Sequence, residues 1–298
     1  MSAVVRRFDR RDRDQLTELM NLHVAAVIPG VVLSVNTVLS QLEREPGESI
    51  VDPWVAERCC LVAELEHRIV AAALLHRFRA DEDVSHSYRG IGDVRWLVCH
   101  VDAGTEGQAL LAAVMDQMRR WGVTAVGFDC ALPAPGCYGI PDTMPHLRAL
   151  LTEAGFGEPT RREFVLAAHC DDLLGADLDG ATVVRTVGML GARFTLSVDE
   201  DTRGYIEVCQ PGGADLARSS VATHWADVGN LILADGAAPA AVIPVLLSVA
   251  ARWLLLGGIT RLIDYWAADV DPPSYLTELQ RAGFQTLVRN ERGFQRSP

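Results

Sequence analysis

Four side chains in the C-terminal half of the chain are of types that transfer protons. Glu207 lies in an apolar stretch after Tyr205 that is typical of a strand, and a carboxylate there can act as a general base. Tyr265 lies at the end of another predicted strand, where its hydroxyl can donate a proton beside the acidic residue Asp264. Tyr275 opens the helix that follows. We therefore predict Glu207, Asp264, Tyr265 and Tyr275 as the catalytic set.

Each of these residues also has a structural interpretation that the sequence leaves open. A strand carboxylate such as Glu207 can be solvated or paired with an arginine. Tyr265 can be an aromatic side chain packed in a core, and Tyr275 a surface aromatic at a helix N-terminus. The choice depends on which side chains meet in the fold.

Metal and covalent chemistry find little support in the sequence. His100 with Asp102 and His224 with Asp227 form pairs, but no third ligand follows at a spacing that suits a metal. The thiol of Cys137 has no base nearby that would activate it. All 27 basic residues are arginine, which excludes a Schiff-base lysine. We expect no metal site.

The elements that would position these residues follow from hydrophobic periodicity and from Gly and Pro breaks. The C-terminal half predicts strands over 183–198, 204–209, 227–234, 261–266 and 286–289, and helices over 239–256 and 273–282. The N-terminal half predicts strands over 4–8, 59–65, 69–78, 94–101, 125–130 and 162–168, and helices ending at 28 and 45 and over 105–121 and 142–154. This alternation is typical of an α/β fold, with a mixed sheet covered by helices on both faces.

The two halves repeat the same order of landmarks. Residues 93–156 read DV-RWLVCHV, a long helix ending WGVT, an apolar FDCA and HLRALLTEAGF. Residues 227–284 read DV-GNLILAD, a long helix ending LGGIT, an apolar IDYWA and YLTELQRAGF. A single repeat of this length indicates a duplicated domain. We predict a first domain over 1–170, a linker over 171–180 and a second domain over 181–298 that lacks the opening strand and two helices.

This order of elements resembles the GNAT (N-acetyltransferase) superfamily, over nearly the whole chain as two tandem units. The segments LRALLTEAGF and LTELQRAGF carry the resemblance, together with ALPAPGCYGIPD in the first half and HWADVGNL in the second. They look like tandem GNAT-like proteins of the actinobacterial type. The resemblance implies that acetyl-CoA or another acyl-CoA lies where the fourth strand splays from the fifth. In the second half it implies cofactor contacts from the strand residues Asn230, Leu231, Ile232 and Leu233 and from the helix start Ala240, Ala241, Val242 and Ile243.

Both halves depart from the GNAT pattern. The loop that would hold the pyrophosphate aligns as Asp102–Gly107 in the first half, where Asp102 and Glu106 would repel it. In the second half it aligns as Ala238–Ile243, with neither glycine nor arginine. Leu151 and Leu279 stand where the family's general-acid tyrosine would be. Neither half therefore keeps the family's loop for the donor or its tyrosine for proton donation.

Composition narrows the context. A net charge of −12 argues against binding nucleic acid, which depends on neutralising phosphates. Seven scattered cysteines, together with a charged rather than apolar N-terminus, are typical of a cytoplasmic protein. The uncharged stretch 237–251 is too short to span a membrane and predicts a buried helix.

The resemblance implies a GNAT-type acyltransferase that transfers an acyl group to an amine of a small molecule. A first alternative is amide formation from a non-CoA donor, such as aminoacyl-tRNA, which the net charge does not favour, or a carrier protein. A second alternative is a non-catalytic module that binds a small molecule or a partner. We expect a monomer or homodimer.

Overall fold

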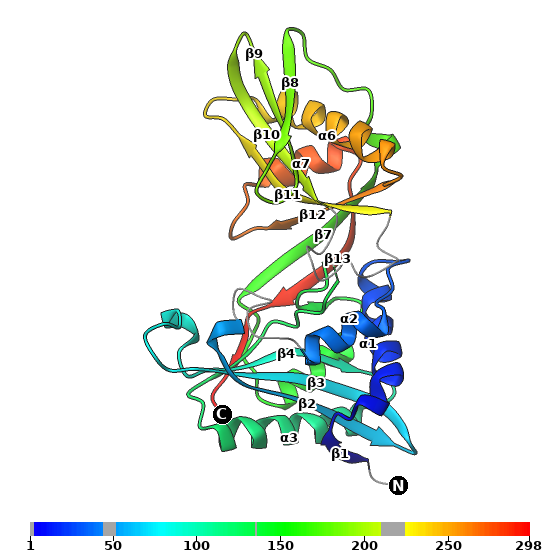
Figure 1. Ribbon diagram of the computed structural model, residues 1–298, viewed down its shortest axis with the longest axis vertical. Coiled ribbons are helices and arrows are strands. Elements are labelled where there is room, and N and C mark those ends of the chain that lie inside the picture. Colours follow the sequence, from blue (N-terminus) through cyan, green and yellow to red (C-terminus); the bar gives the residue numbers. More distant parts are fainter. Residues whose placement is uncertain (1–2, 44–51, 135, 210–223) are drawn as a thin grey trace. The chain divides into compact units, whose positions relative to one another are not determined.

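The computed structural model describes residues 3–43, 52–134, 136–209 and 224–298 (Figure 1). The chain divides into two compact units: residues 1–162 with 290–298, and residues 163–289. This division differs from the predicted one, because the C-terminal residues return to the first unit and the strand predicted at 162–168 lies mostly in the second. Pairing between distant strands decides the division, and hydrophobic periodicity does not report such pairing.

Unit 1 is built on a six-stranded sheet in the order β1-β2-β3-β4-β5-β14. Figure 1 shows α1 and α2 on one side of this sheet and α3 on the other. Its larger elements are β1 (Val4–Arg7), α1 (Arg13–Val27), α2 (Val35–Leu42), β2 (Val55–Leu65), β3 (Arg68–Phe78), β4 (Gly92–Cys99), α3 (Gly104–Trp121), β5 (Val126–Phe128), α4 (Pro145–Glu153) and β14 (Phe294–Arg296). α3 ends at Gly122, which adopts a left-handed conformation (φ +67°) that favours glycine.

The strand β14 was not predicted from the sequence. It pairs antiparallel with β5, which places Phe294 opposite Phe128. The two rings lie 5.9 Å apart between centroids, and both residues are buried. A three-residue strand gives almost no periodic signal of its own, so its existence depends on this distant partner.

The strands of unit 2 lie in one sheet in the order β13-β7-β12-β11-β10-β9-β8. Its elements are β7 (Arg161–His169), β8 (Ala181–Val187), β9 (Ala192–Val198), β10 (Asp201–Cys209), β11 (Trp225–Leu233), α6 (Pro239–Leu256), β12 (Arg261–Ala267), α7 (Pro273–Ala282) and most of β13 (Gln285–Arg292). β7 pairs antiparallel with β12, as β14 pairs with β5 in unit 1. The strand β7, which follows α4 along the chain, therefore belongs to the sheet of unit 2.

Residues 183–198, predicted as one strand, form the hairpin of β8 and β9. The chain turns at residues 188–191, where the amide of Gly188 donates to the carbonyl of Gly191. β8 pairs antiparallel with β9 as β1 pairs with β2, so unit 2 has an opening strand after all. In unit 2 this short turn joins the first two strands, whereas in unit 1 the helices α1 and α2 lie between β1 and β2.

The helix α6 forms the centre of the core of unit 2, within the bounds that the sequence predicts. It is apolar and long enough to cross a membrane by length and composition alone, with a mean hydropathy of 1.9. However, Val242, Leu246 and Ala250 pack in one buried cluster with strand residues such as Ile206 and Leu262. This packing is that of a core helix.

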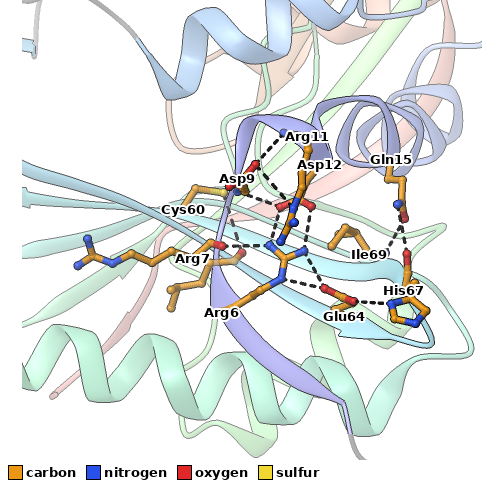
Figure 2. A network of polar contacts seen from close by, with 11 residues as sticks. Arg6, Arg7, Asp9, Arg11, Asp12, Gln15, Cys60, Glu64, His67 and Ile69 are labelled. Carbon is orange, nitrogen blue, oxygen red and sulfur yellow. Dashed lines mark hydrogen bonds and ion pairs between the residues drawn. The ribbon is translucent and has the colours of Figure 1, made fainter.

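The arginine-rich N-terminal segment is paired, as the interleaved aspartates predict. Arg6 contacts both oxygens of Asp12, at 2.6 and 2.8 Å, and lies 2.7 Å from Glu64 on β2 (Figure 2). Asp12 also accepts a hydrogen bond from the amide of Asp9. The guanidinium of Arg6 is the main reason that the pKa of Asp12 is lowered.

We expect Asp12→Ala to destabilise the protein by about 2 kcal/mol, because it removes one of the two carboxylates that bind the partly buried guanidinium of Arg6 and leaves the amide of Asp9 without its acceptor. The lowered pKa means that this stability is present above the pKa of the unfolded carboxyl, about 4, and is lost as the pH falls below it. Urea unfolding at several pH values measures both effects. Asp14→Ala is the matched control: its carboxyl is exposed and lies 3.7 Å from Arg13, so about 0.5 kcal/mol or less is expected. Equal losses for the two variants would contradict the role of the network.

Candidate functional site

The parallel strands β11 and β12 pair only at their beginnings. Trp225, Ala226 and Asp227 pair with residues 261–263, and beyond this point no further pairs join the two strands within the described residues. A cavity of ≈ 530 Å³ opens where the strands separate. It is lined by Val228, Gly229, Asn230, Leu231, Ile232, Leu233, Pro239, Ile243, Asp264, Tyr265, Asp271, Pro272, Ser274 and Tyr275.

Most of the predicted site residues meet in this cavity. They include Asp264, Tyr265 and Tyr275 from the catalytic set, and Asn230, Leu231, Ile232, Leu233 and Ile243 from the donor-binding set. Glu207, Ala240, Ala241 and Val242 do not line it. Asp271, in the turn before α7, and Ser274, in its first turn, also line the cavity. They were not predicted, because nothing in their local pattern marks them.

Two tyrosine hydroxyls bind two carboxyl groups at the cavity. The hydroxyl of Tyr275 donates to Asp264 at 2.5 Å, and that of Tyr265 donates to Asp227 at 3.2 Å. The amide of Tyr265 also donates to Asp264, at 2.7 Å. In the sequence Asp227 stands out only as half of a His–Asp pair. In the structure it instead accepts a hydrogen bond from Tyr265. The other carboxyl oxygen of Asp227 is buried and has no hydrogen-bond partner in the described part of the chain.

Burial makes both carboxyl groups weak acids. Loss of solvent raises the pKa of Asp264 to about 8, while its hydrogen bonds with Tyr275 and Tyr265 act in the opposite direction. Burial likewise raises the pKa of Asp227 to about 7. The pKa of Tyr275 is also raised, by burial and by the nearby Asp264. The site can therefore hold protons at neutral pH that ordinary carboxyl groups would have lost.

Glu207 has the structural role that the sequence left open as its alternative. Its carboxylate is fully buried and accepts from Arg193 at 2.7 Å and from Asn230 at 2.8 Å. The amides of Met189 and Leu190 donate to it as well, at 3.1 and 3.3 Å. These hydrogen bonds lower the pKa of Glu207 against the effect of its burial. The carboxylate fixes the turn between β8 and β9, and its acceptor positions are already used.

The first turn of α6 offers few free amides. Pro239 has no N–H, and the amides of Ala241 and Val242 donate to the carbonyl of Ala238. Among the described residues this leaves the amide of Ala240 as the one N–H of this turn without a backbone acceptor. The side chains of Ala240 and Ala241 point to solvent.

The corresponding edge of β4 in unit 1 is bonded by the segment that follows β5. After β5, the amide of Ala131 donates to the carbonyl of Arg95 on β4, at 2.7 Å, so the chain stays beside β4. Cys130 and Cys137 from this segment are fully buried. Gly107 is packed closely, because a Cβ there would come within 2.7 Å of Leu150. In unit 1 the segment after β5 thus stays on β4, whereas in unit 2 the pairing of β11 with β12 ends at Asp227.

No three His, Cys, Asp or Glu side chains gather as metal ligands within the residues that the structure describes. All seven cysteines are free thiols, and burial raises the pKa of Cys137 above its ordinary value.

Solved structures share this architecture over the full chain. A tandem GNAT protein from the clavulanic acid biosynthesis pathway superposes with a TM-score of 0.64 at 13% identity, covering 99% of this chain and 98% of its own. A GCN5-related N-acetyltransferase from Sphaerobacter thermophilus gives a TM-score of 0.61 at 12% identity, covering 99% and 95%. The chain has the tandem GNAT fold. The resemblance seen in the sequence is confirmed at this level.

A third structure extends the same fold to a larger protein. The glucosamine N-acetyltransferase region of a fungal multi-domain β-N-acetylglucosaminidase gives a TM-score of 0.63 at 14% identity, covering 98% of this chain and 38% of the other. No protein-family model and no curated protein matches the sequence.

In the tandem GNAT fold, the open cavity of unit 2 lies where the resemblance implies an acyl donor, between the fourth and fifth strands of a repeat.

Proposed function

We propose that this protein is an N-acyltransferase that uses the cavity of unit 2 to transfer an acyl group from a thioester to a small-molecule amine. The observation that carries the proposal is the separation of β11 from β12, because it opens a cavity lined by two tyrosines and two aspartates.

The reaction requires little covalent chemistry from the protein. The amine nitrogen attacks the thioester carbonyl, the new C–N bond forms and the C–S bond breaks. An amide of β11 in the stretch Leu231–Leu233 would stabilise the negative oxygen that develops on the carbonyl. The apolar side chains Leu231, Ile232 and Ile243 would hold the donor and exclude water.

Two protons must move in this step. The departing thiolate gains one, and the attacking amine loses one. Burial raises the pKa of Asp264 to about 8, and the hydroxyl of Tyr275 donates to its carboxyl group, so this pair can supply a proton at the cavity. Tyr265 with Asp227 forms a second pair. We assign proton supply to the pair Asp264–Tyr275, because both residues line the cavity.

An aminoacyl-tRNA donor is less well supported. A net charge of −12 opposes binding to a phosphate backbone, and the charged side chains among the described lining residues are aspartates.

Thiol release from acetyl-CoA in the presence of a panel of primary amines tests the proposal. Ser274 is exposed at the cavity, so Ser274→Trp should obstruct it and lower the rate by about tenfold or more without disturbing the core. Thr277→Trp is the matched control, because Thr277 is exposed on the same helix and does not line the cavity. Amine-dependent release that is unaffected by Ser274→Trp would place the reaction elsewhere.

A further inference from the structure

We infer that the cavity recognises its donor through the acyl-pantetheine arm alone, with no contribution from the diphosphate and nucleotide that complete CoA. This inference rests on the proposed function and names its substrate class: pantetheine thioesters, whether the arm belongs to CoA or to a carrier protein.

The start of α6 lacks the hydrogen-bond donors that a diphosphate needs. An anion bound at a helix N-terminus takes its contacts from free amides of the first turn. Here Pro239 has no amide hydrogen, and the amides of Ala241 and Val242 already donate to Ala238, at 3.0 and 3.1 Å. The amide of Ala240 is what remains in this turn among the described residues.

The charges around the cavity also disfavour a diphosphate. Asp271 supplies a carboxylate among its described lining residues, and Asp235 lies exposed in the loop before α6, whereas Asp264 holds its proton at neutral pH. Arg203 lies beside the end of β11, where its carbonyl accepts from the amide of Ala234, and its guanidinium lies 3.7 Å from Asp201. A diphosphate here would meet acidic groups, and no arginine is among the described residues that line the cavity.

The cavity does suit the remainder of the donor. A pantetheine arm consists of apolar groups joined by two amides. From Val228 onward, one edge of β11 has no partner strand in the described part of the chain, so its backbone can pair with those amides. Leu231, Leu233 and Ile243 provide apolar contacts along the same path.

Saturation-transfer NMR with acetyl-CoA tests the inference within one molecule. Saturation of the protein should reach the methyl and methylene protons of the pantetheine arm and leave the adenine protons at about a fifth of that level or less, because groups that are not bound stay in solvent. Titrations with acetyl-CoA and S-acetylpantetheine should give dissociation constants within about threefold of each other. A preference for acetyl-CoA of about tenfold or more, which is 1.4 kcal/mol, would overturn the inference.

Two variants sharpen the test. Ala241→Glu adds an exposed negative charge at the first turn of α6, and Arg203→Ala removes the arginine beside the end of β11. Both should leave acetyl-CoA binding unchanged within about twofold, and weaker acetyl-CoA binding in either variant with S-acetylpantetheine unaffected contradicts the inference. Ser274→Trp should abolish the binding of both ligands. If the unmodified protein binds neither ligand, the proposed function fails together with the inference, whereas nucleotide-dependent binding overturns the inference alone.

Discussion

Replacing Asp264 with Asn is expected to lower kcat for acyl transfer by about 100-fold, the lower end of what a positioned acid or base contributes. The carboxyl group is buried, contacts Tyr275 at 2.5 Å and lines the cavity. Asparagine keeps the acceptor for the amide of Tyr265 but cannot release a proton. Tyr275→Phe removes the other half of the pair and should cause a loss of similar size.

The pH dependence separates proton supply from a structural role. Because the pKa of Asp264 is raised to about 8, the wild-type rate should fall above pH 8 as this group ionises, and the residual rate of Asp264→Asn should lack that step. Asp271→Asn is a suitable control, because Asp271 also lines the cavity but binds the amide of Ala267. An Asp264→Asn enzyme with full kcat and an unchanged pH profile would remove Asp264 from the reaction.

The same pKa has a consequence for stability that needs no substrate. The folded protein holds the Asp264 proton up to about pH 8, whereas the unfolded chain releases it near pH 4. The native state therefore binds more protons between these values, and wild-type stability should decline as the pH rises from 4 to 8. Thermal unfolding across this range should show a smaller decline for Asp264→Asn.

Replacing Glu207 with Ala is expected to destabilise unit 2 by about 3 kcal/mol or more, the cost of removing one partner of a buried charged group. The change leaves Arg193, Asn230 and two amides of the turn 188–191 without their acceptor. Urea unfolding measures the loss. In a double-mutant cycle, Arg193→Ala should cost much less when Glu207 is already absent.

Glu207→Gln tests whether this residue has a catalytic role. Glutamine preserves the shape and part of the acceptor capacity, so acyl transfer should continue at near the wild-type rate although stability falls. The pKa of Glu207 is lowered, so the stability that the carboxylate contributes is present above the unfolded pKa, about 4.3, and is lost as the pH falls below it. A stable Glu207→Gln protein without activity would restore the general-base hypothesis.

Local patterns in the sequence predicted the elements that build the site. The helix α6 lies at the predicted residues 239–256, and β11 and β12 lie within a few residues of their predicted bounds. These elements are long, strongly apolar and bounded by Gly or Pro, so their own residues specify them. The order of the elements then indicated the tandem GNAT fold.

Contacts between residues far apart in the sequence decided the rest. Tyr265 can donate to Asp227 only because β11 and β12 are neighbours. The carboxylate of Glu207 accepts hydrogen bonds from backbone amides only because the turn 188–191 folds over it. Distant contacts also decide that β7 pairs with β12 and that β14 pairs with β5. The partner of a strand depends on side-chain packing and on which backbone groups are free to pair. The sequence by itself thus determined the elements and their order. The tertiary structure alone decided where two neighbouring strands separate, which carboxyl groups are buried and which of them line the cavity.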